Sequence, residues 1–244
     1  MKQAAPARTF SQHILRTKRP PRLALLLLAL ALLLGGCGGG PPKSDELAEK
    51  MASRLERVKT VKGRVRLTLK DVSLLQEVWI QPPKFLRVEI EEGPPQFKGT
   101  ILVLNDKEGW LYSPLLDMAT VVDRSDYTPE IGAPVGSSFL ETLPNDVLAA
   151  LQQARGINVV GEEEVAGRDT YRVEIVLDQE VGIFPPGPLN VWLDSKFYYP
   201  LAFQTATELE MRFEFVKFNE EIDPLTFTFF PPPGATVRRV KKDK

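Results

Sequence analysis

Residues 208–218, ELEMRFEFVKF, contain the clearest structural pattern in the chain. Apolar side chains occupy every second position from 209 to 215, and charged side chains occupy the positions between them. Such alternation is typical of a β-strand that has one face in a hydrophobic core and the other in water. The stretch therefore predicts a strand of an antiparallel sheet with one dry face.

The same period of two recurs along the chain. It is strict in 63–70 and 86–91, and weaker candidate strands are 75–81, 99–105, 109–113, 118–124, 158–163, 170–177, 189–194 and 199–205. Two segments have a helical period instead. The first runs from Ser44 to about Lys59 with an apolar stripe, and the second runs from Asn145 or Asp146 to about Arg155. Residues 132–144 are loop-like.

These elements predict one domain that is mainly β with some α, with about ten or eleven antiparallel strands and two helices. A sheet with one dry face needs a cover. Two arrangements remain open at this point: a second sheet packs on the dry face, or the sheet curls and the helices close its open side.

The N-terminal region has the organisation of an export signal. Residues 1–36 contain six basic residues, no acidic residue and an unbroken apolar run from Leu23 to Leu34. The run is shorter than the ~20 residues of a transmembrane helix. Cys37 follows Leu-Gly-Gly directly, as in the bacterial lipobox, so we expect residues 1–36 to be a lipoprotein signal peptide and Cys37 to carry a lipid. A soluble secreted protein or an uncleaved anchor are the alternatives. Residues 37–43 are Gly/Pro-rich and predict a tether, which leaves 44–244 as the folded domain.

Composition argues against several classes of function. His13, the only histidine, and Cys37, the only cysteine, leave residues 38–244 with neither side chain. Histidine-based and thiol-based catalysis, disulfides and most transition-metal sites are thereby removed. Residues 37–244 carry 25 basic and 32 acidic side chains, a net charge of −7, which disfavours nucleic-acid binding. We therefore expect no enzyme activity, no cofactor, no metal and no nucleic-acid partner.

Three further segments have two readings each. Glu162, Glu163 and Glu164 are candidate carboxylates for hydrolysis, although a solvated turn is favoured because no acid/base pair is placed. The apolar loop 181–188, VGIFPPGP, is a candidate partner contact, or it folds back on its own domain. The basic tail 238–244 suits anionic headgroups, or it is a frayed terminus.

The C-terminal half carries an ordered set of motifs. These are VWLD at 191–194, YPL at 199–201, Asn219 after a strand, Ile222-Asp223, and FTFFPPPGA at 227–235. Their order resembles that of the LolA-like superfamily, the group of LolA and LolB lipoprotein carriers, RseB regulators and LppX/LprG lipoproteins. VWIQPPKFLRVE at 78–89 and GWLYSP at 109–114 agree with it. The resemblance covers about residues 44–240.

The resemblance implies a single open half-barrel whose concave face is covered by helices and holds acyl chains. The residues predicted to line that face are Val65, Leu67, Leu69, Leu86, Val88, Ile90, Trp110, Tyr112, Val173, Ile175, Leu209, Met211, Phe213 and Phe215. Large aromatic residues expected to shape the cavity mouth are Trp79, Trp110, Tyr112, Trp192 and Phe203. For any single one of these residues, a place in a filled hydrophobic core is the alternative.

Two functions follow. The first is a lipid-anchored extracytoplasmic protein, attached through Cys37 to the cytoplasmic or outer membrane, that binds acyl chains of a lipid or acylated protein. The second is a protein-interaction module of the same fold that senses the envelope or regulates an envelope protein. The tether at Cys37 is a departure from the soluble LolA carrier and favours a membrane-fixed acceptor, binding protein or sensor.

Overall fold

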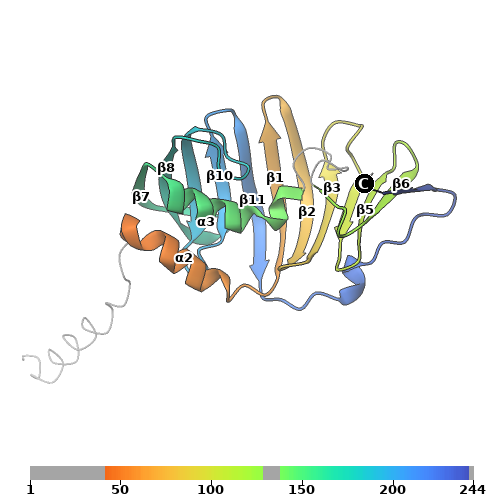
Figure 1. Cartoon of the computed structure of the whole chain (residues 1–244), viewed down its shortest axis with the longest axis horizontal. Coiled ribbons are helices and arrows are strands. Elements are labelled where there is room, and N and C mark those ends of the chain that lie inside the picture. Colours follow the sequence, from red (N-terminus) through yellow and green to blue (C-terminus); the bar gives the residue numbers. More distant parts are fainter. Residues whose placement is uncertain (1–41, 129–137, 242–244) are drawn as a thin grey trace, which may run out of the picture. The chain divides into compact units, whose positions relative to one another are not determined.

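The computed structural model describes residues 42–128 and 138–241, and twelve strands in these ranges form one sheet (Figure 1). The strand order is β12-β6-β5-β4-β3-β2-β1-β11-β10-β9-β8-β7. The strands are β1 (Val61–Leu69), β2 (Val72–Gln81), β3 (Phe85–Glu92), β4 (Ile101–Leu104), β5 (Glu108–Ser113), β6 (Met118–Asp123), β7 (Gly156–Val165), β8 (Arg168–Leu177), β9 (Gly187–Asp194), β10 (Pro200–Thr205), β11 (Leu209–Phe218) and β12 (Thr236–Val240). The sheet is open, because its edge strands β12 and β7 do not pair with each other.

Two helices lie across one face of this sheet, which we call the helix face (Figure 1). They are α2 (Leu47–Leu55) and α3 (Leu143–Gln153), preceded by the 3₁₀ turns η1 (Ser44–Glu46) and η2 (Ser138–Glu141). Leu47 and Met51 of α2 and Val147 of α3 are fully buried in the main core, together with the inward side chains of the strands. The apolar stripes of the helices therefore cover the dry face of the sheet, as their helical period predicts.

The opposite face, which we call the outer face, is covered only in part by the chain's own C-terminal segment. The 3₁₀ turn η3 (Pro224–Phe227) lies near β3, and Phe229 packs against Val103 and Ala119. Its ring centroid lies 5.5 Å from that of Trp110 and 5.8 Å from that of Tyr112. A small second core thus sits on the outer face of β4 to β6.

A β-bulge interrupts the pairing of β1 with β11. Val65 pairs with Phe213 and Arg64 pairs with Phe215, so β11 holds one extra residue between these pairs. Gly63 lies beside the bulge, where an added Cβ would stand 2.5 Å from the carbonyl oxygen of Phe215. Only glycine allows the backbones to approach so closely here.

The structure confirms the predicted fold: a mainly β domain with one open sheet and two helices. Three details were wrong. The first helix ends at Leu55 rather than near Lys59, and a twelfth strand, β12, was not predicted. β12 also pairs parallel to β6, whereas an antiparallel sheet was expected. Residues 1–36, Cys37 and most of the tether lie outside the described residues, so the signal peptide and the lipid anchor stay predictions.

Candidate functional site

Nine of the predicted lining residues lie on the helix face, and each is at most 3% exposed. They are Val65, Leu67, Leu86, Val88, Ile90, Val173, Ile175, Met211 and Phe213. Leu69 and Leu209 pair with each other at the strand ends and are less buried. The structure therefore brings most of the predicted set together as one apolar surface.

Phe215 was predicted on this surface, and that prediction is wrong. The bulge in β11 turns Phe215 to the outer face, where it is 46% exposed. Trp110 and Tyr112 were also misplaced, because they belong to the small core around Phe229 on the outer face. The expected mouth residues Trp79 and Trp192 are likewise on the outer face, since they pair with Lys62 and Arg172 across the sheet.

Phe203 lies in the main core instead of at a mouth. It is fully buried, and its ring centroid is 5.2 Å from that of Phe184 in an edge-to-face contact. Phe184 belongs to the apolar loop 181–188, so this part of the loop folds back onto its own domain. Phe139 of η2 approaches Phe203 from the other side at 5.9 Å.

A pocket of about 450 Å³ opens at the edge of the helix layer. Its apolar lining comes from Leu55 and Val58 after α2, from Pro82 and Pro83 between β2 and β3, and from Tyr199 before β10. Val58 and Tyr199 also belong to the main core. The pocket therefore ends directly on the apolar layer between sheet and helices.

The polar rim of this pocket centres on an ion pair between Arg124 and Glu141, both partly buried. Thr142 and Asn145 add hydrogen-bonding groups at the start of α3. Burial raises the pKa of Glu141 above its ordinary value of 4.5, although Arg124 opposes the shift. Burial likewise raises the pKa of the Tyr199 phenol, which stays neutral at all ordinary pH values.

The raised pKa of Glu141 predicts a pH dependence of stability. A carboxyl whose pKa is higher in the folded state contributes stability below its unfolded pKa and loses it as pH rises through the folded value. Relative to Glu141→Gln, the wild-type chain should lose stability as pH rises above 4.5. Urea unfolding of both proteins from pH 4 to pH 7 measures this difference. A gap that stays constant or moves the other way would contradict the assignment.

Nothing in the sequence indicates that Arg124, Glu141 and Tyr199 form one site. They lie in the turn after β6, in η2 and before β10, so only the folded chain brings them together. Pro82-Pro83 was identified, but as a tight turn. The order of the C-terminal motifs around Tyr199 was the one available signal near the pocket.

The glutamates 162–164 lie inside β7 rather than in a turn. Glu163 accepts a hydrogen bond of 2.7 Å from the indole N–H of Trp192 and pairs with Arg172 at 3.2 Å. The Trp192 hydrogen bond, with help from Arg172, lowers the pKa of Glu163. This carboxylate is thus held ionised within a surface network on the outer face.

The polar residues of the C-terminal motifs hold turns and strand ends together. Asp194 pairs with Arg168 at 2.5 Å and accepts the backbone N–H groups of Lys196 and Phe197. Asn219 accepts the N–H of Lys59 at 2.7 Å and donates to the carbonyl of Arg57 at 3.0 Å. Their contacts are therefore those of structural residues.

Asp223 has the same kind of role at the start of η3. Its Oδ1 accepts the backbone N–H of Leu225 at 2.9 Å and so caps the turn. Among residues 42–128 and 138–241, no helix has the length and apolar character needed to cross a membrane.

Comparisons with known proteins agree with this architecture. No family model matches the chain. An uncharacterized protein of Methanocaldococcus jannaschii is 21% identical over 214 residues, which are 86% of this chain. The chain spans 59% of that relative's length.

Solved structures are similar over more of their own length. An uncharacterized conserved protein from Thermus thermophilus is 15% identical with a TM-score of 0.52, covering 81% of this chain and 99% of that one. The Mycobacterium tuberculosis lipoprotein LppX is 15% identical with a TM-score of 0.48, covering 74% and 99%. At such identities the likeness concerns the fold, and the chain has the open-sheet fold of the LolA-like superfamily.

Proposed function

We propose that this chain is a lipid-anchored extracytoplasmic protein that binds an acyl chain between its sheet and its helix layer. The lipid or acylated protein would enter at the pocket beside Tyr199, and Cys37 would hold the domain at the membrane surface. The observation that carries the proposal is the direct continuity of that pocket with the main apolar core.

The energetics of entry favour a long apolar ligand. Each methylene transferred from water to the core contributes ~0.8 kcal/mol, so a chain of many methylenes supplies a large driving force. The helix face is closely packed, so entry requires α2 and α3 to move away from the sheet. The cost is bounded by the short apolar contact of α2, which buries only Leu47 and Met51.

The rim supplies groups for a polar head. Arg124, Thr142 and Asn145 lie together at the pocket edge. An anionic headgroup that replaces Glu141 as the partner of Arg124 would exchange one ion pair for another, which keeps the arginine satisfied as the ligand enters. A phospholipid or fatty acid therefore suits the pocket better than an uncharged alkane.

The packing of the helix face favours a second function, a protein-interaction module that senses or regulates an envelope partner. The nine predicted lining residues on that face are already covered by other side chains. A filled domain of this fold would act through its surface. The two functions differ in whether the helix layer opens to admit lipid.

Native mass spectrometry of residues 38–244, combined with organic extraction, distinguishes them. We expect one lipid or fatty acid per chain, either co-purified or taken up from added phospholipid. Leu55→Arg, which places a charge at the pocket wall without entering the centre of the core, should reduce loading at least ~10-fold. Leu225→Arg, at a residue 67% exposed elsewhere, is the matched control and should load normally.

An empty domain that ignores added lipid would contradict acyl-chain binding and favour the interaction module. Equal loading by both arginine variants would place the ligand somewhere other than the pocket beside Tyr199. Thermal unfolding of each variant checks that Leu55→Arg is folded when its loading is measured.

A further inference from the structure

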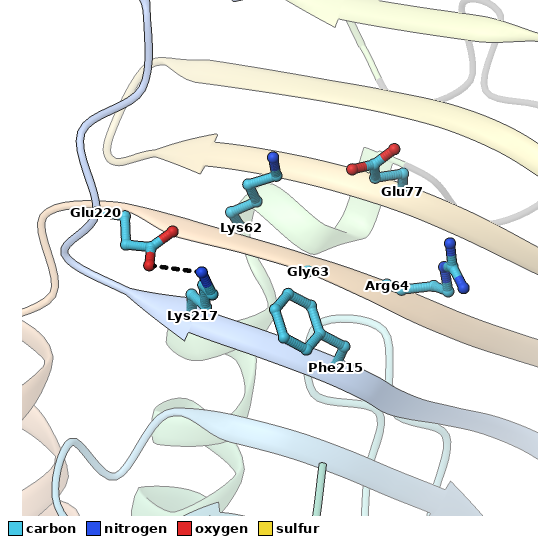
Figure 2. A pocket seen from close by; sticks show the side chains of 7 residues that line it. All are labelled: Lys62, Gly63, Arg64, Glu77, Phe215, Lys217 and Glu220. Carbon is cyan, nitrogen blue, oxygen red and sulfur yellow. Dashed lines mark ion pairs between the residues drawn. The ribbon is translucent and has the colours of Figure 1, made fainter. Parts of the chain in front are cut away.

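The outer face carries a second pocket, of about 460 Å³, where β1, β2 and β11 meet (Figure 2). Phe215 lies at its centre because the bulge turns this ring away from the core. Bulges commonly redirect a side chain at functional places in a sheet. An aromatic ring placed in this way on a charged face indicates a contact surface.

Most charges around Phe215 are already paired. Arg64 lies 3.0 Å from Glu91, Lys217 lies 2.8 Å from Glu220, and Arg66 lies 2.7 Å from Glu214. Ion pairs thus neutralise most of this face from within the chain.

Two opposite charges in the pocket lack such a partner in the described part of the chain. The Lys62 ammonium lies 5.7 Å from the centroid of the Trp79 ring but forms no ion pair. Glu77, on the neighbouring strand, forms neither an ion pair nor a hydrogen bond through its carboxylate. Figure 2 shows both beside Phe215.

The register of the strands sets their spacing. Arg64 pairs with Phe215 on one side and Glu77 on the other, and Lys62 is two residues from Arg64 along β1. Standard strand spacing then places Lys62 about 8 Å and Glu77 about 10 Å from Phe215 along the sheet. The two unpaired charges are therefore at nearly equal distances from the exposed ring.

We propose that this surface binds a second copy of the same chain about a two-fold axis through Phe215. Such an axis lies in the contact plane and brings Phe215 against its counterpart. It also exchanges the positions of Lys62 and Glu77, so each meets the opposite charge on the partner copy. Arg64 lies close to the axis, where Glu91 neutralises it.

Charge complementarity selects this occupant over others. A uniformly acidic partner or an anionic membrane pairs with Lys62 but repels Glu77, and a uniformly basic partner has the reverse defect. A second copy supplies both charges at matched spacing. Because these groups are on the surface, the contact is weak and weakens further in high salt.

Photo-crosslinking of the full chain in a bacterial membrane tests the contact. Two copies with different epitope tags carry benzoylphenylalanine in place of Phe215, and a crosslinked band with both tags reports self-contact. Lys62→Glu in both copies, or Glu77→Lys in both copies, should reduce that band at least ~10-fold, because like charges then face each other.

Mixing the two variants gives the decisive arm. A Lys62→Glu copy and a Glu77→Lys copy together present opposite charges at both positions, so the crosslink should return to near the wild-type level. Benzoylphenylalanine in place of Leu225, an exposed residue outside the pocket, should give no band with both tags. No self-crosslink at 215, crosslinks to other proteins alone, unaffected single reversals, or no recovery in the mixture would each overturn the proposal.

Discussion

Phe213→Asp should prevent the domain from folding, whereas Phe215→Asp, two residues along the same strand, should leave it folded. Phe213 is 1% exposed and packs edge-to-face with Tyr199, with ring centroids 6.3 Å apart. Removing a buried phenylalanine side chain costs ~3–5 kcal/mol, and a carboxylate without a partner adds several more. The sum approaches the ~5–15 kcal/mol that a whole domain has available.

Phe215→Asp has the same chemistry in a different environment. Its side chain is already in water on the outer face, so the expected change in the free energy of unfolding is within ~0.5 kcal/mol. Urea unfolding followed by near-ultraviolet circular dichroism measures both variants. Val88→Asp on β3 should behave like Phe213→Asp, because Val88 is equally buried on the helix face.

The comparison tests the bulge itself. If β11 were regular, Phe213 and Phe215 would share a face and both substitutions would be severe. Equal and large effects would therefore contradict the assignment of Phe215 to the outer face. Phe213→Leu, which keeps an apolar side chain, should remain folded and allows lipid loading to be measured with an altered core.

The strands were predictable because each alternates apolar and polar side chains over five or more residues, as in 208–218. Alternation predicts a face only while the strand adds no residue. The extra residue in β11 reverses the parity after Phe213, and its cause is partly remote, since Gly63 on β1 provides the space. No pattern within 208–218 marks the bulge.

The other errors have similar physical origins. In β5 the apolar residues Trp110, Leu111 and Tyr112 are consecutive, so alternation does not choose between the faces. The choice is made by Phe229, which arrives from a segment more than 100 residues later. β12 has no buried face, and its Arg239 is held by Glu108 at 2.9 Å and Asp123 at 2.7 Å, so hydrophobic periodicity did not reveal it.

The candidate site was predictable as a surface but not as a pocket. The helix face follows from the shared apolar side of many strands, which is a property of each strand alone. The pocket beside Tyr199 depends on where the end of α2, the β2–β3 turn and η2 meet. Such a meeting of distant segments is set by tertiary packing, for which a single sequence carries no direct signal.

The second large effect should come from Asp194, the acidic residue of the VWLD motif. Its carboxylate is 1% exposed, pairs with Arg168 and accepts two backbone N–H groups of the turn after β9. Removing one partner of a buried pair costs ~3–5 kcal/mol, and because Arg168 is partly exposed we expect ~2–4 kcal/mol for Asp194→Ala. Asp194→Asn keeps an oxygen for the two N–H groups and should lose only ~1–2 kcal/mol.

Asp178→Ala is the matched control, because Asp178 forms its ion pair with Arg155 at 3.2 Å in open solvent. An exposed pair contributes little, so this variant should lie within ~0.5 kcal/mol of wild type. Urea unfolding of the three variants should therefore give a graded series, with Asp194→Ala the least stable. If Asp194→Ala is no less stable than Asp178→Ala, the motif aspartate does not support the fold, and its role has to be sought in ligand or partner binding. A graded loss with unchanged lipid loading per folded chain would instead mean that the motif specifies the architecture of the domain and leaves its ligand to the pocket beside Tyr199.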